Sequence, residues 1–268
     1  MQLAAESEDI ALVIVSNTRP SGQEFAFGRR QTQVQTFEGR LRNGGANVED
    51  VRDRMRQSAM PGTSRHHWGT DIDLAVRGSE NRAFQASSWE EGNLLLAYNW
   101  LSDNAASFGF YQTYTSKEDD ERTGYEEEPW HWSFMPSAAD YLDSYNENIS
   151  NGDLTGFEGD QFVNEINPIG EYVNGLPENL LNFPEEERIP RTEAGGYYAY
   201  RVSTDRGDDL RVRDEPTVAG NIIGRIPNGQ TFYPRSLVES PQGTWGLIRE
   251  GYYIAIELDG KVYARSVR

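Results

Sequence analysis

All three histidines of this chain, His66, His67 and His131, lie in two short motifs that also carry carboxylates. The first motif is SRHHWGTDID at residues 64–73, and the second is EPWH at residues 128–131. Imidazoles, a carboxylate ligand and a spare glutamate are the groups of a catalytic zinc site, which keeps one position open for water. A carboxylate that is not a ligand can take the proton of that water. The pattern therefore predicts metal-dependent hydrolysis.

The spacing within each motif predicts the elements that must position these groups. Residues 70–76 alternate and then become apolar, which is typical of a strand that enters a core. Alternation places Asp71 and Asp73 on the same face of that strand. Gly69 permits a tight turn before the strand. Glu128 and His131 are three residues apart around a proline, so a bend lets both face one metal.

The two motifs together resemble the zinc metallopeptidases that act on the D-Ala-D-Ala ends of bacterial cell-wall peptides. That family includes VanY-type D,D-carboxypeptidases, VanX-type D,D-dipeptidases and related phage endolysins, and its pattern is SxHxxGxxxD followed by ExWH. The resemblance covers roughly residues 8–150. It implies that His66, Asp73 and His131 hold Zn2+ and that Glu128 is the general base. His67 is expected to pack or to support the site rather than to bind metal.

The resemblance also implies a catalytic arginine upstream of the first motif. The family carries a Ser-x-x-Arg stretch on a strand near the cleft, and residues 16–19 (SNTR) fit that place after the apolar run 10–15. Arg19 is thus predicted to stabilise the oxyanion or to clamp the substrate carboxylate. Ser64 is an alternative clamp, and Trp130 is predicted to wall the substrate pocket. The sequence does not decide which residue stabilises the oxyanion and which one binds the substrate carboxylate.

The chain departs from the family pattern at Asp71, where alanine is usual. A second carboxylate at this position orients a ligand or hydrogen-bonds the loop, and we do not expect it to bind the metal. The family also has a glutamine a few residues after the arginine, and this chain has none at a clearly equivalent position. The candidates for that glutamine are Gln23, Gln31, Gln33 and Gln35.

Composition excludes several classes of function. The net charge of −18 over 268 residues argues against nucleic-acid binding, which needs a basic surface. No apolar run is long enough to span a bilayer, so membrane insertion is not expected. The absence of cysteine excludes disulfides and thiolate metal sites. The expected partner is a peptidoglycan stem peptide, and the chain is expected to act as a monomer. A periplasmic or extracellular location is expected, with an export signal on the natural precursor because none is visible here.

The fold class predicted is α+β: a zinc peptidase domain at 1–150 with a small antiparallel sheet flanked by helices, then a small β-barrel. Strands are predicted at 10–15, 70–76 and 109–114, and helices at 31–42, 48–58, 89–104 and 136–146. The run Ser88-Trp89-Glu90-Glu91 predicts a capping box for the third helix. Residues 151–196 are predicted to form a helical extension, with a break at Pro168, and an acidic linker.

From residue 197 to 268, short strands alternate with Gly, Asn and Pro turns, which indicates a small barrel. This part resembles the bacterial Src-homology-3-type (SH3-like) domain in the stretches 210–216, 222–229 and 245–248. It departs from that pattern at 254–261, which lacks the usual Gly-Trp-Val. The resemblance implies a module that targets the cell wall, with a purely structural cap as the alternative.

The sequence therefore predicts a secreted zinc D,D-carboxypeptidase that removes the terminal D-Ala from stem peptides. Two alternatives stay open. One is an endolysin-type endopeptidase that cuts an internal bond such as L-Ala-D-Glu, and the other is a wall-binding protein whose metal is only structural. An open cleft with Glu128 beside the metal would favour an enzyme and rule out the binding protein.

Overall fold

The computed structural model describes residues 1–17, 34–35, 37–39, 41, 47–56, 58–189, 199–249 and 251–267. It divides into two compact units, Met1–Glu185 and Glu186–Arg268, which we describe separately. Half of the residues in the helix predicted at 31–42 lie outside the described residues, and residues 34, 35, 37 and 38 are helical.

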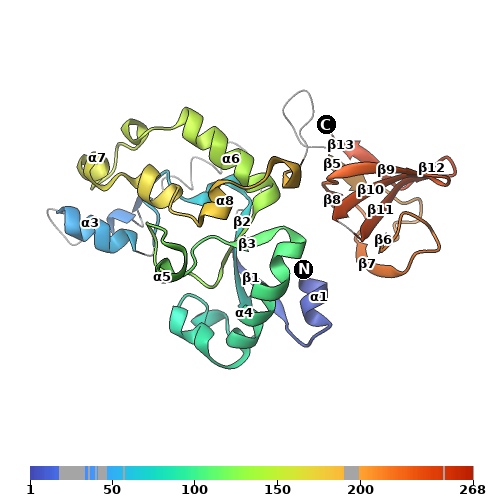
Figure 1. Cartoon of the computed structure of the whole chain (residues 1–268), viewed down its shortest axis with the longest axis horizontal. Coiled ribbons are helices and arrows are strands. Elements are labelled where there is room, and N and C mark those ends of the chain that lie inside the picture. Colours follow the sequence, from blue (N-terminus) through green and yellow to red (C-terminus); the bar gives the residue numbers. More distant parts are fainter. Residues whose placement is uncertain are drawn as a thin grey trace. The chain divides into compact units, whose positions relative to one another are not determined.

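A four-stranded antiparallel sheet forms the centre of the first unit (Figure 1). Its order is β1-β2-β4-β3, with the bounds Leu12–Asn17, Asp71–Val76, His131–Phe134 and Phe110–Gln112. The small antiparallel sheet predicted from the alternating segments is thus present. Strand β2 is central and almost wholly buried, which accounts for its change from alternating to apolar residues. Strands β2 and β4 pair with Asp73 directly opposite His131.

Helices and short turns surround this sheet. The α-helices are α1 Gln2–Glu6, α3 Val48–Met55, α4 Gly92–Asn104, α5 Lys117–Asp120, α6 Met135–Asn148, α7 Val163–Ile166 and α8 Glu178–Leu181. The 3-10 turns are η1 Arg65–Trp68, η2 Glu80–Arg82, η3 Ala86–Glu90, η4 Ala105–Phe108, η5 Asn151–Asp153, η6 Asp160–Phe162 and η8 Glu185–Glu187, and η7 Ile169–Val173 is a π-turn.

Two hydrophobic clusters support the sheet. One joins β2 to α4 through Leu74, Leu94, Trp100 and neighbouring side chains. The other gathers around α3 and α6, with Met55 and Met135 fully buried. Burying side chains of this size contributes about 1.5–3 kcal/mol each. The strands that carry the two predicted metal motifs therefore pack against these clusters.

The capping box predicted at Ser88 is wrong. Residues 86–90 form the 3-10 turn η3, with Ser88 and Trp89 buried, and α4 begins later at Gly92. Its N-cap is Glu91, whose side chain makes no capping hydrogen bond. The physical reason is that Trp89 packs into the core and donates its indole N–H to the carbonyl of Ala83, which requires a turn rather than a helix start.

The segment that follows α6 packs into the first unit. Leu154, Phe157, Ile166 and Leu180 are all buried in the cluster that also holds Met135. The chain does break beside Pro168: α7 ends at Ile166, its C-cap Asn167 has a left-handed φ of 53°, and η7 begins at Ile169. A domain boundary after residue 150 stays a prediction, whereas the compact unit continues to Glu185.

The second unit consists of β-strands in two sheets. The larger sheet has the order β7-β6-β11-β10-β9, and β12 also pairs with β11; the smaller has the order β13-β5-β8. The strands are β5 Ala199–Val202, β6 Leu210–Arg213, β7 Ile222–Ile226, β8 Thr231–Phe232, β9 Ser236–Ser240, β10 Gly243–Arg249, β11 Tyr252–Leu258, β12 Lys261–Val262 and β13 Ala264–Val267. Trp245 and Ile254 are at the centre of their shared core.

The prediction of a closed C-terminal barrel is wrong. Within the described part of the chain, β7 and β9 form the two edges of the larger sheet, and no strand pairing joins them or links the two sheets. The strands of the smaller sheet are two to four residues long and pair only with each other. Alternating sequence predicts strands well, but the pairing of sheet edges depends on register and strand length.

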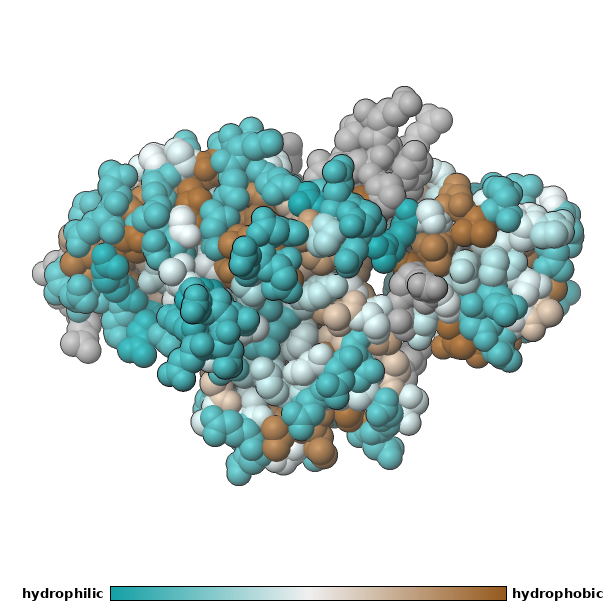
Figure 2. All heavy atoms as spheres, in the orientation of Figure 1, coloured by the Kyte–Doolittle hydropathy of each residue, from teal (hydrophilic) through white to brown (hydrophobic). Residues whose placement is uncertain are grey.

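Hydrophilic side chains cover most of the visible face of the first unit, with apolar residues showing between them (Figure 2). Among the helices that the structure describes, none combines the length and the apolar character needed to cross a membrane.

Candidate metal centre

His66 reaches the site from the 3-10 turn η1, which Gly69 closes with a left-handed φ of 81°. Nδ1 of His66 lies 3.1 Å from the backbone carbonyl of Asp71. Because a carbonyl only accepts, Nδ1 donates in this contact, and Nε2 is the ring nitrogen left to face the cluster. Nε2 faces the carboxylate of Asp73, with 3.3 Å between it and Oδ2.

Asp73 and His131 meet because β2 and β4 place them opposite each other. Nδ1 of His131 is 3.1 Å from Oδ1 of Asp73. One ligand atom from each of His66, Asp73 and His131 lies within 4.8 Å of the others, so the three could hold one metal ion. His67, by contrast, is exposed and lies outside this cluster.

Asp71 lies behind His131 rather than in the cluster. Its Oδ1 is 3.0 Å from Nε2 of His131 and also accepts from Nε of Arg65 at 3.1 Å. Its Oδ2 accepts from the hydroxyls of Thr70 at 2.7 Å and Ser133 at 3.1 Å. The Asp71 carboxylate thereby fixes the imidazole ring: Nε2–H of His131 donates to Asp71, and Nδ1 faces Asp73. Such hydrogen bonds between a carboxylate and a ligand histidine are typical of metal sites.

The Asp71 carboxylate is stable as an anion although it is fully buried. Burial favours its neutral form, but the Arg65 guanidinium and the hydrogen bond with His131 outweigh burial and hold its pKa well below the usual range. Arg65 is itself buried, donates to Ser133 at 3.0 Å and lies 4.5 Å over the ring of Trp68. Position 71, where the family pattern has alanine, thus carries a carboxylate whose charge is compensated by the buried Arg65.

The side chains fit a divalent cation. Oδ1 of Asp73 is buried, its contact with His131 lacks hydrogen-bond geometry, and no described residue supplies another partner. A buried carboxylate oxygen without a partner is costly unless a cation compensates it. Burial lowers the pKa of His131, but Asp71 and Asp73 outweigh burial and raise it to about 10. The same two carboxylates favour a metal ion at Nδ1 in place of the proton, and binding would release that proton.

Glu128 occupies the turn just before β4. Its backbone N–H donates to the backbone carbonyl of Tyr114 at 2.8 Å, and its own carbonyl accepts from the backbone N–H of His131 at 3.1 Å. Oε2 lies 3.6 Å from Nδ1 of His131, which is near the cluster but beyond hydrogen-bond distance. Burial is the main cause that raises the pKa of Glu128 to about 7, and the Asp73 carboxylate adds to it. A carboxylate with a pKa near neutrality is suited to accept and return a proton.

A cavity of about 400 Å³ opens onto this cluster. Its lining includes the predicted metal ligands and Glu128, together with the predicted substrate contacts Ser64 and Trp130. Arg19 lies outside the described residues. Sequence reasoning missed Arg54, a half-buried residue of α3 that lines the same cavity. Nothing in its local sequence distinguishes it from Arg52 and Arg56, because only the packing of α3 brings it to the cavity.

The loop before Glu128 is held by Arg122. This buried guanidinium donates through Nε to the carbonyl of Thr115 at 2.8 Å. Its Nη1 donates to the carbonyls of Thr123 at 3.0 Å and Tyr125 at 2.7 Å. One side chain therefore connects both ends of the loop that carries Glu128.

We expect Arg122→Ala to lower the free energy of unfolding of the first unit by about 2–4 kcal/mol, because buried carbonyls lose a charged donor. Chemical denaturation followed by circular dichroism measures this. Arg82→Ala is the matched control: among the described residues, the Arg82 side chain makes only an exposed 3.6 Å ion pair with Glu91, and its loss should cost about 0–1 kcal/mol. Equal losses in the two variants would contradict the role of Arg122.

The cavity thus brings together two histidines and an aspartate that could hold one metal ion, with a glutamate beside them, which are the groups that metallopeptidases use. A comparison with protein families agrees: residues 1–137 match the family model described as VanY, D-alanyl-D-alanine carboxypeptidase. The chain belongs to this family. Family membership as predicted from the two motifs is confirmed.

Individual relatives overlap only in part. An uncharacterized protein of Haemophilus influenzae is 32% identical over 83 residues, which are 28% of this chain and 60% of that protein. A D-alanyl-D-alanine carboxypeptidase of Enterococcus faecalis is 34% identical over 77 residues, which are 29% of this chain and 24% of the enzyme. The chain thus spans less than two thirds of either relative.

Solved structures of similar proteins include VanYB in complex with D-alanine-D-alanine, at 20% identity and a TM-score of 0.35. The alignment covers 65% of this chain and 74% of that one. A VanY D,D-pentapeptidase variant in complex with Zn(II) is 21% identical, with a TM-score of 0.34, over 65% of this chain and 75% of that one. Overlaps at these TM-scores are too small to support a functional argument.

Proposed function

We propose that the first unit is a zinc-dependent D,D-carboxypeptidase that hydrolyses the terminal D-Ala from peptidoglycan stem peptides. The observation that carries this proposal is the meeting of His66, Asp73, His131 and Glu128 in one cavity of a VanY-family chain. His66, Asp73 and His131 would hold the ion, and a set of two imidazoles and one carboxylate is a common ligand set of catalytic zinc. Such an ion supplies Lewis acidity toward water and the scissile carbonyl.

The residues of the chain perform the remaining steps. Glu128 accepts a proton from the water that adds to the carbonyl carbon, and it donates that proton to the D-Ala amine as the C–N bond breaks. Asp71 keeps the His131 ring in the orientation that directs Nδ1 to the ion. Arg19 is proposed to stabilise the oxyanion. Trp130 and Ser64 are proposed to contact the substrate from the cavity wall.

Arg54 favours a substrate with a free carboxyl end. It is a cation that lines the cavity beside Ser64 and Glu128, and a guanidinium pairs well with a carboxylate. A C-terminal D-Ala presents such a group, whereas an internal bond does not. This observation supports the carboxypeptidase over the endopeptidase alternative.

We expect Arg54→Gln to raise KM for a D-Ala-D-Ala peptide by about tenfold or more, because a charge-assisted hydrogen bond is lost. Steady-state kinetics with a peptide and with its C-terminal amide measures the effect. The variant should lose its preference for the free acid over the amide. Arg52→Gln is the matched control on the same helix, since Arg52 donates to the carbonyl of Glu165 and does not line the cavity. An unchanged acid preference in Arg54→Gln would remove Arg54 from substrate recognition.

The direct test of the function is incubation of the zinc-loaded protein with muropeptides ending in D-Ala-D-Ala, with products identified by mass spectrometry. We expect loss of a single alanine, and no loss after treatment with a chelator. Release of a larger fragment would favour the endopeptidase. No cleavage by protein that retains zinc would favour a wall-binding protein with a structural metal.

For the second unit we propose a bacterial SH3-like module. The support is the strand pattern around Trp245, although its sheets are not closed. We further propose that the protein acts as a monomer. We also propose a location in the periplasm or outside the cell, because the proposed substrate is cell wall.

A further inference from the structure

Charge is distributed unequally between the two units. Residues 186–268 contain twelve Arg or Lys and twelve Asp or Glu, so they are neutral overall, and residues 1–185 carry the whole net charge of −18. Several cations of the second unit line one cavity of about 1010 Å³. They are Arg206, Arg211, Arg213, Arg225 and Lys261.

Two of these arginines face each other across a strand pair. Strands β6 and β7 are antiparallel, and Arg211 is directly opposite Arg225. Like charges in such a pair repel each other and destabilise the sheet. Both side chains are exposed, and neither forms a hydrogen bond or ion pair with any residue in the described part of the chain. The structure thus places two guanidinium groups on opposed positions of the strand pair, each without a hydrogen-bond or ion-pair partner among the described residues.

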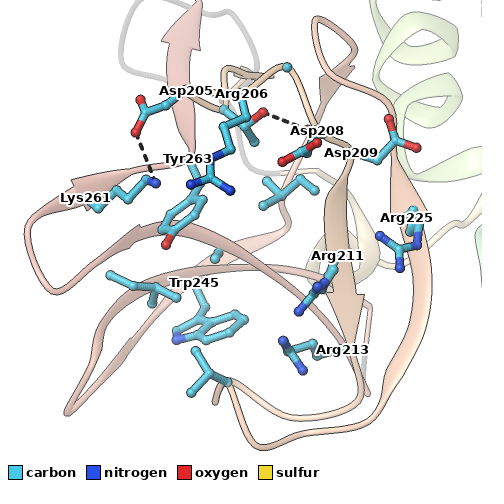
Figure 3. Close-up of a pocket in the computed structure, with 16 residues that line it drawn as sticks. Asp205, Arg206, Asp208, Asp209, Arg211, Arg213, Arg225, Trp245, Lys261 and Tyr263 are labelled. Atoms are coloured by element: carbon cyan, nitrogen blue, oxygen red, sulfur yellow. Dashed lines mark hydrogen bonds and ion pairs between the residues drawn. The ribbon is translucent and has the colours of Figure 1, made fainter.

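A third guanidinium is held nearby. Arg213 is two residues beyond Arg211 on β6 and therefore shares its face of the sheet. Its Nη1 donates to the carbonyl of Gly220 at 2.6 Å, which restricts the side chain. Figure 3 shows Arg211, Arg213 and Arg225 gathered at one side of the cavity, with Lys261 at the other.

Nearby carboxylates compensate these arginines only in part. Asp205 forms an ion pair with Lys261 at 3.0 Å. Asp214 accepts two hydrogen bonds of 2.7 Å from Asn221 in the turn between β6 and β7. Asp208 and Asp209 are the other carboxylates of the cavity lining, against four arginines. The cavity therefore has a surplus of positive charge on a unit that is neutral overall.

Apolar side chains complete the cavity. Leu210, Trp245, Ala255 and Leu258 belong to its lining, and all four are buried in the core of the second unit. A ligand that fits this surface combines an anionic group with a small apolar part. Guanidinium groups bind the oxygens of carboxylates and phosphates in a bidentate manner.

We infer that this cavity is a binding site for an oxyanion, carboxylate or phosphate, with Arg211 and Arg225 as the principal contacts and Arg213 beside them. Binding would relieve the repulsion between the two opposed arginines. The inference concerns the second unit alone and holds whether or not the first unit hydrolyses peptides. Two sources supply this chemistry in a cell wall: peptide carboxylates and phosphodiester polymers.

The test uses the full-length protein after chelator treatment, so that added anions meet no metal ion in the first unit. The Nε–Hε NMR signals of Arg211 and Arg225 are assigned from R211Q and R225Q and then followed during titration with inorganic phosphate. We expect saturable shifts of both signals that sodium chloride at equal ionic strength does not produce. Shifts that are linear in concentration, or equal in chloride, would overturn the site.

Matched variants and two further probes complete the experiment. R211Q/R225Q should weaken phosphate binding at least about tenfold, as measured by the shift of the Trp245 indole signal. R265Q removes a charge from the exposed face of β13, outside the cavity lining, and should leave binding unchanged. If R265Q weakened phosphate binding equally, the overall charge of the unit would explain the effect, and the site would be refuted. Titrations with N-acetyl-D-alanyl-D-alanine and with a glycerol phosphodiester oligomer then identify the source, since the true ligand saturates the Arg211 signal at lower concentration.

Discussion

Glu128→Gln should abolish most hydrolysis of D-Ala-D-Ala peptides and leave metal binding intact. The amide keeps the size of the side chain but cannot accept a proton from water, so kcat should fall by about 10²–10⁴-fold. Metal content measured by mass spectrometry should stay near one ion per chain, because Glu128 is adjacent to the ligand cluster and not part of it. His131→Ala, by contrast, should lose both metal and activity.

The acidic run that contains Glu128 offers a matched control. Glu127 is its immediate neighbour, but it does not line the cavity, and its side chain accepts only a long 3.5 Å hydrogen bond from Tyr98 in the part of the chain that the structure describes. Glu127→Gln should therefore turn over substrate at nearly the rate of the natural sequence. Near-normal kcat in Glu128→Gln, with metal bound, would show that another group is the base.

Asp71→Ala should have the second large effect, on stability and on metal affinity at once. It leaves the buried Arg65 guanidinium without its counter-charge, and breaking a buried pair in this way costs about 3–5 kcal/mol of unfolding free energy. It also frees the His131 ring, so the metal dissociation constant should rise about 10–100-fold. Chemical denaturation and competition with a coloured chelator measure the two quantities separately.

A double variant separates the two roles of Asp71. Arg65→Met combined with Asp71→Ala removes both buried charges, so much of the lost stability should return. Metal affinity should stay low, because the hydrogen bond to Nε2 of His131 is still missing. If affinity recovered together with stability, Asp71 would be a structural partner of Arg65 alone.

The sequence predicted the parts of the site that depend on local pattern. Alternation in 71–76 indicated the strand that places Asp71 and Asp73 on one face, and the two motifs indicated which side chains meet. It did not predict that Arg65 and Ser133 share the Asp71 carboxylate. Ser133 reaches Asp71 only through the pairing of β2 with β4, and Arg65 reaches it from the 3-10 turn η1. Arg54 was missed for the same reason, since its position relative to the cavity is set by tertiary packing.

The fold was predicted in a similar way. Apolar periodicity located the three longest described helices of the first unit, α3, α4 and α6, and the strands β1, β2 and β3, while the start of α4 was displaced by the burial of Trp89. In the second unit, the strands were predicted but their closure into a barrel was not observed, because edge pairing is a long-range property. The prediction of Arg19 falls on residues that the structure does not describe.

The pairing of β2 with β4 also determines which changes in chain length the site tolerates. Asp73 and His131 face each other by strand register, so their separation does not depend on the length of the connection between them. Insertions near α5, in the exposed part of that connection, should leave the ligand geometry unchanged. A single residue inserted within either strand would turn one ligand to the opposite face of the sheet. Natural length variation among homologues should therefore concentrate in the connection and be absent from the two strands.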